Sequence, residues 1–365
     1  METHIQYAII GGGPAGSYLG YCLAKKGIYP VVFDDSHPRE KPCGGGISTL
    51  SIEKFPILHG IPIPKAPDKS MELISPKGLK VVTKSEKESW CVSRLSMDEY
   101  LLNKSKKNGC KHISEHVKEV TKTNGVWKIK TNLSNYKADV IIGADGVNSI
   151  TRNRILGSIS KRNLGVCYGC FATSKYEENV SMKFLKKIHG YCWCFPRYNN
   201  LSIGIVVPHD LGKEVKILFE DFVNKYYPHI KIISRYGALI PFVSDPGFFD
   251  IPICGLNWLL VGDAAGHVDP ITGEGITYAL WGAELAANAI HKGNIQSYSY
   301  SWKKEFGKIL VNNCKMRNII YKLFKVFLVS NPGVENANLF NGNHFDFFFI
   351  FYIHAASLVP INPDL

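Results

Sequence analysis

The first apolar run of the chain ends in a cluster of glycines. Residues 7–10 read Y-A-I-I, residues 11–16 read G-G-G-P-A-G, and apolar positions then recur at helical spacing up to Leu23. A second apolar run, residues 31–33, ends in Asp34. This pattern predicts a complete strand–helix–strand unit, with the glycines in the turn between the first strand and the helix.

Two later apolar runs also end in short polar turns. Residues 138–143 read A-D-V-I-I-G and lead to Asp145 and Gly146. Residues 259–262 read L-L-V-G and lead to Asp263 and then to a second glycine-rich turn, P-I-T-G-E-G-I. Because ligands of open α/β sheets bind beyond the carboxyl ends of the strands, we expect these turns to build one site. The domain that carries this site is therefore discontinuous in sequence.

The apolar runs between these turns are shorter and are punctuated by turn residues. They fall at residues 71–82, 164–172 and 202–207 and predict a largely antiparallel sheet. Residues 300–329 carry apolar side chains at helical spacing and many basic residues, which predicts a basic amphipathic segment. The expected fold class is α/β, with a Rossmann-like domain (1–65, 90–155 and 255–299), an antiparallel-sheet substrate domain (66–89 and 156–254) and a C-terminal helical and tail region (300–365).

Composition and charge limit the class of protein. The chain has 365 residues, of which 45% are hydrophobic, and this is enough to bury the cores of two domains. The N-terminus lacks the pattern of a secretory signal, so we expect a cytoplasmic protein with reduced cysteines. The net charge of +12 suits an acidic protein partner or peripheral contact with an anionic membrane, and no nucleic-acid-binding motif accompanies it.

The glycine turn has the residues that a dinucleotide needs. Gly11 makes the tight turn, Gly13 lets the backbone approach a pyrophosphate, and Gly16 lets the helix pack on the strand. Asp34 stands where an acid accepts the ribose hydroxyls. From these residues alone, both NAD and FAD stay open.

The three turns together resemble the FAD-dependent oxidoreductases of the aromatic-hydroxylase superfamily. The resemblance implies FAD as the cofactor, with Asp263 at its ribityl chain and Arg94 near it. The alternative for Arg94 and Asp98 is an i, i+4 ion pair on a helix surface.

Three further motifs resemble the geranylgeranyl reductases of that superfamily. They are P-C-G-G-G at residues 42–46, Y-C-W-C-F-P at residues 191–196, and P-I-T-G-E-G-I at residues 270–276. The resemblance implies an FAD site formed by Gly11, Gly13, Pro14, Ala15, Gly16, Asp34, Cys43, Gly44, Gly45, Arg94, Asp145, Gly146, Asp263, Pro270, Gly273, Gly275 and Ile276.

Alkene reduction requires a proton donor as well as a hydride donor. Cys43 is our candidate, because the resemblance places its loop near the flavin, and Glu274 and Tyr191 are the rivals. The glycines beside Cys43 would leave room for the flavin and the alkene to stack. Strand alternation puts Tyr191, Trp193 and Phe195 on one face, as a wall for a prenyl chain or as ordinary core residues. Cys43 has a similar alternative as a small buried hydrophobe.

Four cysteines have spacings that superficially suggest a metal site. Cys167 and Cys170 form a C-x2-C pair, and Cys192 and Cys194 form a C-x-C pair. Both pairs fall inside predicted strands, whereas zinc sites usually use turns that bring both thiolates inward. We therefore expect core packing and no metal.

The resemblance implies an FAD-dependent oxidoreductase of lipid biosynthesis, including phospholipid metabolism. It would reduce C=C bonds of geranylgeranyl chains on a prenylated lipid or a prenyl diphosphate. NAD(P)H and reduced ferredoxin both stay open as electron sources, and the positive charge would suit an acidic electron-donor protein. Two alternatives remain: an FAD-dependent aromatic monooxygenase or halogenase, and a prenyl-lipid-binding protein of the same fold without turnover.

Overall fold

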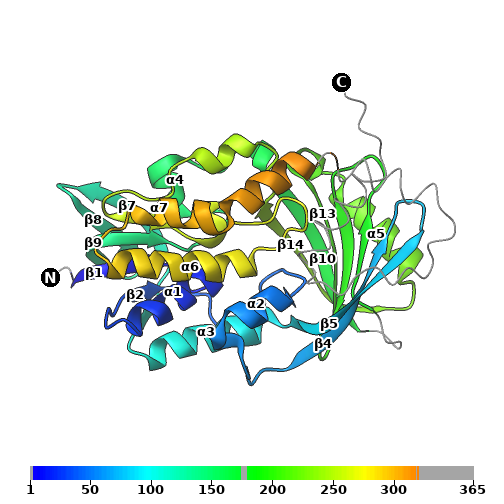
Figure 1. Cartoon of the computed structure of the whole chain (residues 1–365), viewed down its shortest axis with the longest axis horizontal. Helices are drawn as coiled ribbons and strands as arrows, with labels where there is room; N and C mark the ends of the chain where they lie inside the picture. Colours follow the sequence, from blue (N-terminus) through cyan, green and yellow to red (C-terminus); the bar gives the residue numbers. More distant parts are fainter. Residues whose placement is uncertain (1–2, 174–178, 318, 320–365) are drawn as a thin grey trace. The chain divides into compact units, whose positions relative to one another are not determined.

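The computed structural model describes residues 3–173, 179–317 and 319, and these residues form two compact units (Figure 1). Unit 1 covers residues 3–41, 94–165 and 239–315, and unit 2 covers the described residues within 42–93, 166–238 and 316–319. Both units are discontinuous in sequence. Residues 42–65, which we expected in the Rossmann-like domain, belong to unit 2, where residues 46–47 pair with its sheet.

Unit 1 contains the elements expected of a nucleotide-binding fold. Its strands are β1 (Thr3–Ile10), β2 (Val31–Phe33), β6 (Lys111–Ile113), β7 (Val117–Thr123), β8 (Val126–Thr131), β9 (Asn135–Gly143) and β15 (Trp258–Leu260). Its helices are α1 (Pro14–Ala24), α3 (Arg94–Lys107), α4 (Ile150–Leu156), α6 (Ile276–His291) and α7 (Ser297–Trp302), with 3-10 turns η2 (Lys161–Asn163), η4 (Pro246–Asp250) and η5 (Gly262–Ala265).

The strands of unit 1 form one sheet in the order β6-β2-β1-β9-β8-β7, and β15 also pairs with β9. The pairs β6–β2, β2–β1, β1–β9 and β9–β15 are parallel, whereas β8 is antiparallel to its two neighbours. The parallel strands therefore present their carboxyl ends at one edge of the sheet. This edge is where the three turns that follow β1, β9 and β15 lie.

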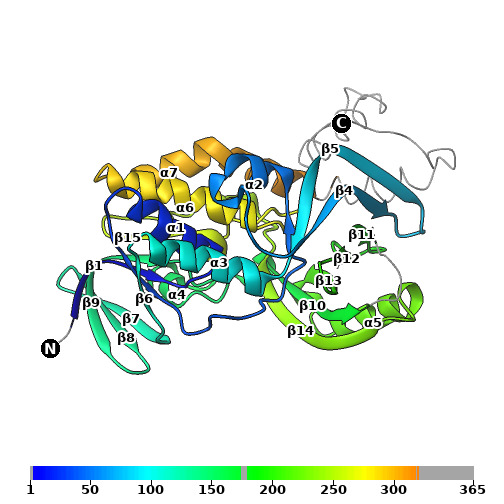
Figure 2. The ribbon, with the colours of Figure 1, turned by 90° about the horizontal axis from the view of Figure 1, so that it is seen from below.

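Two layers of side chains bury the sheet of unit 1. Helix α1 lies between α3 and α6 and also contacts β1 and β2 (Figure 2). A second core contains Ile5, Phe33, Trp127 and Tyr136, with Ile150 of α4 packed against it. The near-continuous apolar runs of β1 and β9 are explained by this burial on both faces.

Unit 2 is built around a second, larger sheet. Its strands are β3 (Gly46–Ile47), β4 (Lys65–Ile74), β5 (Lys80–Val92), β10 (Leu164–Thr173), β11 (Ser181–Phe184), β12 (Tyr191–Pro196), β13 (Leu201–Pro208) and β14 (Lys231–Pro241). Its helices are α2 (Thr49–Lys54) and α5 (Val215–Tyr226), with 3-10 turns η1 (Pro56–Leu58) and η3 (His209–Leu211).

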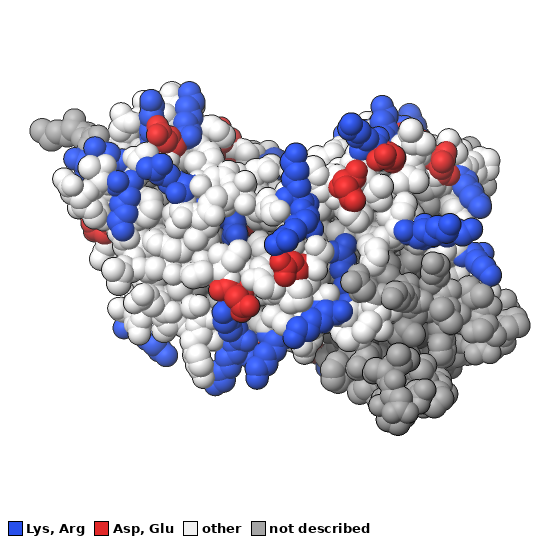
Figure 3. All heavy atoms as spheres, turned by 90° about the horizontal axis from the view of Figure 1, so that it is seen from above, with Lys and Arg blue, Asp and Glu red and all other residues white. Residues whose placement is uncertain are grey.

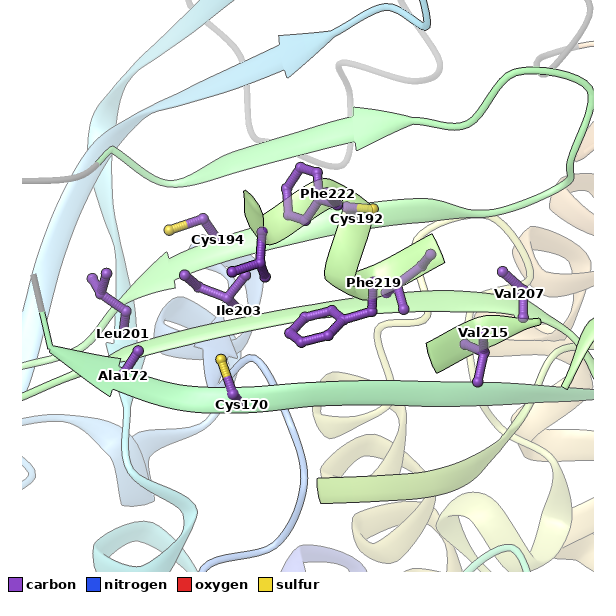
Figure 4. Close-up of a cluster of buried hydrophobic side chains, with 12 residues drawn as sticks. Cys170, Ala172, Cys192, Cys194, Leu201, Ile203, Val207, Val215, Phe219 and Phe222 are labelled. Carbon is purple, nitrogen blue, oxygen red and sulfur yellow. The ribbon is translucent and has the colours of Figure 1, made fainter. Parts of the chain in front are cut away.

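This sheet has the order β14-β10-β13-β12-β11-β4-β5-β3. The pairs β3–β5, β4–β5, β11–β12 and β12–β13 are antiparallel, and β11 pairs with β4 in parallel. Helix α5 covers one face, where Phe219 and Phe222 pack on the buried thiols of Cys170, Cys192 and Cys194 (Figure 4). The expected fold class, an α/β nucleotide-binding fold with a largely antiparallel second sheet, is confirmed.

The C-terminal region is described only in part. Helix α7 is followed by a π-helical turn, Lys303–Gly307, and residues 308–317 are again helical. The rest of the predicted amphipathic segment and the apolar tail lie outside the described residues. Within the described part of the chain, no helix is long and apolar enough to cross a membrane. On the face in Figure 3, Lys and Arg side chains are scattered, with Asp and Glu among them.

We predict that Phe219→Ala lowers the free energy of unfolding of unit 2 by about 3–5 kcal/mol, because its fully buried ring leaves a cavity against the cysteines. Ile217→Ala on the same helix is the control; its side chain is 66% exposed, and the expected change is within about 0.5 kcal/mol. Urea unfolding of both variants measures the difference. Equal stabilities would show that α5 does not pack as described.

Candidate functional site

The glycine turn after β1 is shaped by close backbone contacts. Gly11 has a φ of +101°, and a Cβ there would lie 2.4 Å from the carbonyl oxygen of Ala144. A Cβ on Gly16 would lie 1.9 Å from the carbonyl oxygen of Gly11. Two of the three motif glycines are therefore required by the fold itself. The turn after β1 also touches the start of the turn after β9.

Gly13, the remaining motif glycine, faces open space. A Cβ there would meet only Arg39, whose Nη2 lies 3.9 Å away. Gly13 is also the N-cap of α1, has no side-chain capping hydrogen bond, and is followed by a first turn without acidic residues. An uncapped helix N-terminus with an arginine beside it favours an anion such as a pyrophosphate. Pro14 and Ala15 form the buried start of this helix.

Asp34 at the end of β2 is tied to the glycine turn. Its carboxylate accepts hydrogen bonds from the Gly12 amide at 2.6 Å, the Ser36 amide at 2.8 Å and the Ser36 hydroxyl at 2.5 Å. Burial raises the pKa of Asp34, but the hydrogen bonds outweigh it, so that the pKa lies below its usual value. Three donors leave about one acceptor position of this carboxylate for a ribose hydroxyl.

Arg94 and Asp98 form a buried pair on α3. The Arg94 Nε and Nη2 atoms donate to the two carboxylate oxygens of Asp98 at 2.7 and 2.8 Å. The side chains are only 4% and 0% exposed, so the surface-pair interpretation is wrong. Arg39 approaches the same carboxylate, with its Nη1 3.6 Å away, and donates through Nε to the Ser36 hydroxyl at 2.7 Å. This network connects α3 to the residues around the glycine turn.

Asp145 after β9 is engaged by its own chain. Its carboxylate accepts from the Ser149 hydroxyl and from the amide and hydroxyl of Thr151, at 3.1 and 3.2 Å, at the start of α4. Burial is the largest influence and raises the pKa of Asp145, although these hydrogen bonds oppose it. Gly146, with a φ of +78°, makes the turn. Any cofactor contact here would therefore come from the backbone more readily than from this carboxylate.

Asp263 lies in the η5 turn after β15, close to the first glycine turn. A Cβ on Gly262 would lie 2.9 Å from the Cβ of Ala15, so the two turns touch. The Asp263 carboxylate is 3.3 Å from the Lys41 ammonium, and a Cβ on Gly275 would approach its Oδ1 to 3.3 Å. The structure thus brings together the three turns that the sequence pattern predicted to share one edge.

The P-I-T-G-E-G-I turn is organised by a buried aspartate. Asp269 Oδ1 accepts from the amides of Ile271 and Thr272 at 2.9 and 2.8 Å, and its carbonyl accepts from the Gly273 amide at 3.0 Å. Gly273 has a φ of +70°. Pro270 is buried beside it. The turn is therefore rigid without help from a ligand.

The same turn leads directly into helix α6. Gly275 is the N-cap of α6 and provides no side-chain cap, and Ile276 is the first helical residue. The Glu274 carboxylate accepts a hydrogen bond from the hydroxyl of Thr277. This bond holds the carboxylate against the first turn of the helix.

The Cys43 loop lies in unit 2, and its glycines are explained by packing. A Cβ on Gly44 would lie 2.6 Å from the Phe195 ring, and a Cβ on Gly46 would lie 3.1 Å from it. Gly45 has a φ of +84° and faces the Val92 carbonyl oxygen, which a Cβ would approach to 2.1 Å. The Phe195 ring thus fills the space on the Cβ side of Gly44 and Gly46. Room for a stacked flavin and alkene beside these glycines stays a prediction.

Cys43 itself is half-buried and held on both sides. Its Sγ accepts a hydrogen bond from the Gly45 amide at 3.3 Å. Its carbonyl oxygen accepts from Arg197 Nη2 at 2.6 Å and from the Ser202 hydroxyl at 2.9 Å. Because Cys43 is only half-buried, its side chain is not part of the apolar core.

The aromatic side chains of β12 form one face of this strand. The rings of Tyr191 and Trp193 lie 6.2 Å apart, and both residues are less than a tenth exposed. Trp193 also covers Gly204 of the neighbouring strand, where a Cβ would lie 2.2 Å from the indole. These contacts are packing within the sheet, and a role of this face as a wall for a prenyl chain stays a prediction.

The opposite face of β12 carries Cys192 and Cys194, which are fully buried in the apolar core under α5. Burial raises the pKa of Cys192 well above its usual value and that of Cys170 to about 11. Among the described residues, no group of three or more His, Cys, Asp or Glu side chains is arranged to hold a metal ion. Cys170, Cys192 and Cys194 pack in the core, whereas Cys167 is only partly buried.

Several candidate residues escaped sequence reasoning. Arg39 and Lys41 flank the nucleotide-side turns, and Arg197 and Ser202 contact the Cys43 loop. A run of basic residues in P-R-E-K-P-C, directly after the Asp34 strand, was the available signal for the first two. Arg197 and Ser202 had no local signal, because their partners lie more than 150 positions away.

We predict that Asp98→Ala lowers the free energy of unfolding by about 3–5 kcal/mol, because it leaves the buried Arg94 guanidinium without its carboxylate. Glu53→Ala is the matched control: it breaks an ion pair with Lys87 whose side chains are 44% and 55% exposed, and should cost under about 1 kcal/mol. Denaturant titration compares the two variants. A loss in Asp98→Ala no larger than in the control would contradict the buried network.

Comparisons with known proteins identify relatives over most of the chain. A digeranylgeranylglycerophospholipid reductase from Methanococcus vannielii is 28% identical over 352 residues, which cover 88% of each chain. A geranylgeranyl diphosphate reductase from Rhodobacter capsulatus is 30% identical over 304 residues, which cover 77% of this chain and 73% of the relative. A search against protein-family models found no match.

The fold has a similar solved structure. The crystal structure of a geranylgeranyl bacteriochlorophyll reductase-like protein from Thermoplasma acidophilum superimposes with a TM-score of 0.78 at 20% identity and covers 90% of both chains. The structural likeness supports the fold, and the sequence identity supports the family. Because the Rhodobacter relative matches over more than two thirds of its length at 30% identity, the chain belongs to the geranylgeranyl reductase family, as its motifs predicted.

Proposed function

We propose that this protein is an FAD-dependent oxidoreductase that reduces C=C bonds of geranylgeranyl-type isoprenoid chains, on a prenylated lipid or a prenyl diphosphate. The observation that carries the proposal is an intact dinucleotide turn in a chain whose relatives are named reductases of such chains. Such a reaction belongs to lipid biosynthesis. It would take place in the cytoplasm or at the membrane surface.

The residues around the first glycine turn fit the ADP part of FAD. Gly13 leaves the space that a pyrophosphate would fill, the N-terminus of α1 is uncapped, and Arg39 supplies a positive charge beside it. Asp34 has an acceptor position left for the ribose. Lys41 and Asp263 flank the path toward the second turn, where Asp263 would hold the ribityl chain.

The turn before α6 fits the flavin ring. Reduced FAD, when bound, supplies the hydride that adds to one carbon of the alkene. The backbone of Gly273 and Gly275 and the uncapped start of α6 at Ile276 would face the negatively charged edge of the ring. Asp269 fixes this backbone beforehand, so little reorganisation is needed.

Cys43 is the proposed donor of the proton that completes the reduction. The Gly45 amide points at Sγ, the atom on which negative charge develops when the proton leaves. The rival Glu274 has its carboxylate bonded to Thr277, and the rival Tyr191 lies in the aromatic wall. With Trp193, that wall would line the prenyl chain.

The electron source and the contacts of the protein belong to the same proposal. NAD(P)H and reduced ferredoxin are both compatible with the site, and the positive charge would suit an acidic donor protein or peripheral membrane contact. The names of the relatives favour the reductase over a monooxygenase, a halogenase or a lipid-binding protein without turnover.

The cofactor site predicts weaker FAD binding in Arg39→Met. Loss of the guanidinium beside Gly13 should raise the Kd for FAD by about tenfold or more, since a hydrogen bond to a charged group contributes about 1.5–3 kcal/mol. Arg154→Met, an exposed substitution on α4, should leave the Kd unchanged. Flavin fluorescence titration of the apoprotein measures both. An unchanged Kd in Arg39→Met would remove Arg39 from the site.

Single turnover without oxygen tests the proposed activity. We expect dithionite-reduced holoprotein to be reoxidised by a geranylgeranyl lipid or diphosphate, with two hydrogens added to the product for each saturated bond. Flavin absorbance follows the reoxidation and mass spectrometry follows the product. Stably bound FAD that ignores every prenyl substrate but consumes oxygen with an aromatic compound would favour the monooxygenase alternative instead, and inert flavin would favour lipid binding.

A further inference from the structure

The peptide that carries Cys43 is clamped by one hairpin of unit 2. Arg197 follows β12 and donates from Nη2 to the Cys43 carbonyl oxygen at 2.6 Å and from Nε to the Gly44 carbonyl oxygen at 3.2 Å. Ser202 on β13 donates to the same Cys43 carbonyl at 2.9 Å. The hairpin itself is closed by the Arg197 amide, which donates to the Asn200 carbonyl at 2.7 Å.

The bonding directions around Ser202 are consistent. Because its single hydroxyl proton goes to Cys43, its oxygen accepts from the Tyr236 hydroxyl at 3.0 Å and from the Trp193 indole at 3.4 Å. Ser202 is fully buried, so its position is fixed by the sheet. Ser202 therefore acts from a strand, whereas Arg197 acts from the first position of the hairpin turn that its own amide closes.

Arg197 is only 6% exposed, and its guanidinium lies over the Phe171 ring, 4.6 Å from the ring centre. Keeping a charge in such a place is costly, and core packing alone would not require it. Its planar fork reaches two consecutive carbonyl groups, which a lysine ammonium would not match in the same geometry. The arrangement fixes the orientation of the Cys43–Gly44 peptide and hence the direction of the Cys43 side chain.

We propose that Arg197 and Ser202 are positioning residues that aim the Cys43 thiol for proton transfer. The inference rests on the proposed function. The thiol gives its proton to the second alkene carbon after the hydride has reached the first, and the thiolate regains a proton from water, so atoms and charge balance. Neither Arg197 nor Ser202 needs to touch the substrate in this role.

The test compares Arg197→Met, Arg197→Lys and Ser202→Ala with the wild-type protein, and Arg235→Met is the control. Arg235 lies in the same unit, in a partly exposed ion pair with Glu220. The first measurement is the single-turnover rate with a geranylgeranyl substrate. We expect Arg197→Met to slow it by about 10–100-fold, Arg197→Lys to restore part of it, and Ser202→Ala to have a smaller effect.

The second measurement does not depend on activity. All ten cysteines are described, and only Cys43 and Cys167 are not buried, so iodoacetamide should modify these two. Mass spectrometry gives the ratio of the modification rate at Cys43 to that at Cys167, and the rate at Cys167 reports any general loss of packing in unit 2. We expect Arg197→Met to change this ratio by about tenfold, because the Cys43 side chain is no longer held in one direction. Arg235→Met should leave the ratio unchanged.

The two measurements separate the possible failures. An unchanged ratio and rate in Arg197→Met, or an equal change at Cys43 and Cys167, would overturn the positioning role. If the wild-type protein reduces no prenyl substrate, the proposed function fails, while the ratio still decides whether Arg197 aims the thiol. If Arg197→Met does not fold, Ser202→Ala and Arg197→Lys decide on the same two readouts.

Discussion

The carboxylate of Asp98 is the interaction on which the nucleotide side of unit 1 depends. It is fully buried, it binds the Arg94 guanidinium through both oxygens, and it lies 3.6 Å from Arg39. From Arg39 the network continues through Ser36 to Asp34, whose other oxygen accepts from the amide of the glycine turn. Asp98, which touches no expected ligand, thus helps to place Arg39 and Asp34, the proposed pyrophosphate and ribose contacts. Removing Asp98 would therefore alter the proposed pyrophosphate position although the glycine turn itself is unchanged.

Glycine plays different parts in the two units. In unit 1, Gly13 leaves space that a ligand would fill, whereas Gly11 and Gly16 permit backbone contacts that no other residue allows. In unit 2, the loop around Gly44 is closed by Phe195, so the glycines allow the chain to pack tightly around a cysteine. A glycine therefore marks unfilled space in one motif and close packing against a side chain in the other. Only the neighbours of each glycine, which come from distant strands, decide which applies.

Local patterns predicted the elements better than the site. Apolar runs and turn glycines were sufficient for β1, β9, β15 and the order of their turns, because burial and backbone geometry impose them within a few residues. For Arg94 and Asp98, the i, i+4 spacing left a surface ion pair open as the alternative to a place near the cofactor, because this spacing carries no information about which helix face is covered. Arg197 was missed because it acts on carbonyl groups far away in sequence, and such groups exist at every position. The P-C-G-G-G motif therefore identified Cys43 but not Arg197 and Ser202, the side chains that bond to its peptide.

The burial of thiols in unit 2 has a consequence for chemical damage. Cys170, Cys192 and Cys194 are sealed beneath α5, and oxidation depends on access and on thiolate character. Peroxide formed near a flavin would therefore reach Cys43 and Cys167 before any core cysteine. In the role proposed for Cys43, its conversion to a sulfenic acid would remove the proton that completes the reduction without disturbing the core. The protein would then lose the proposed activity while staying folded, and a thiol reductant would restore it.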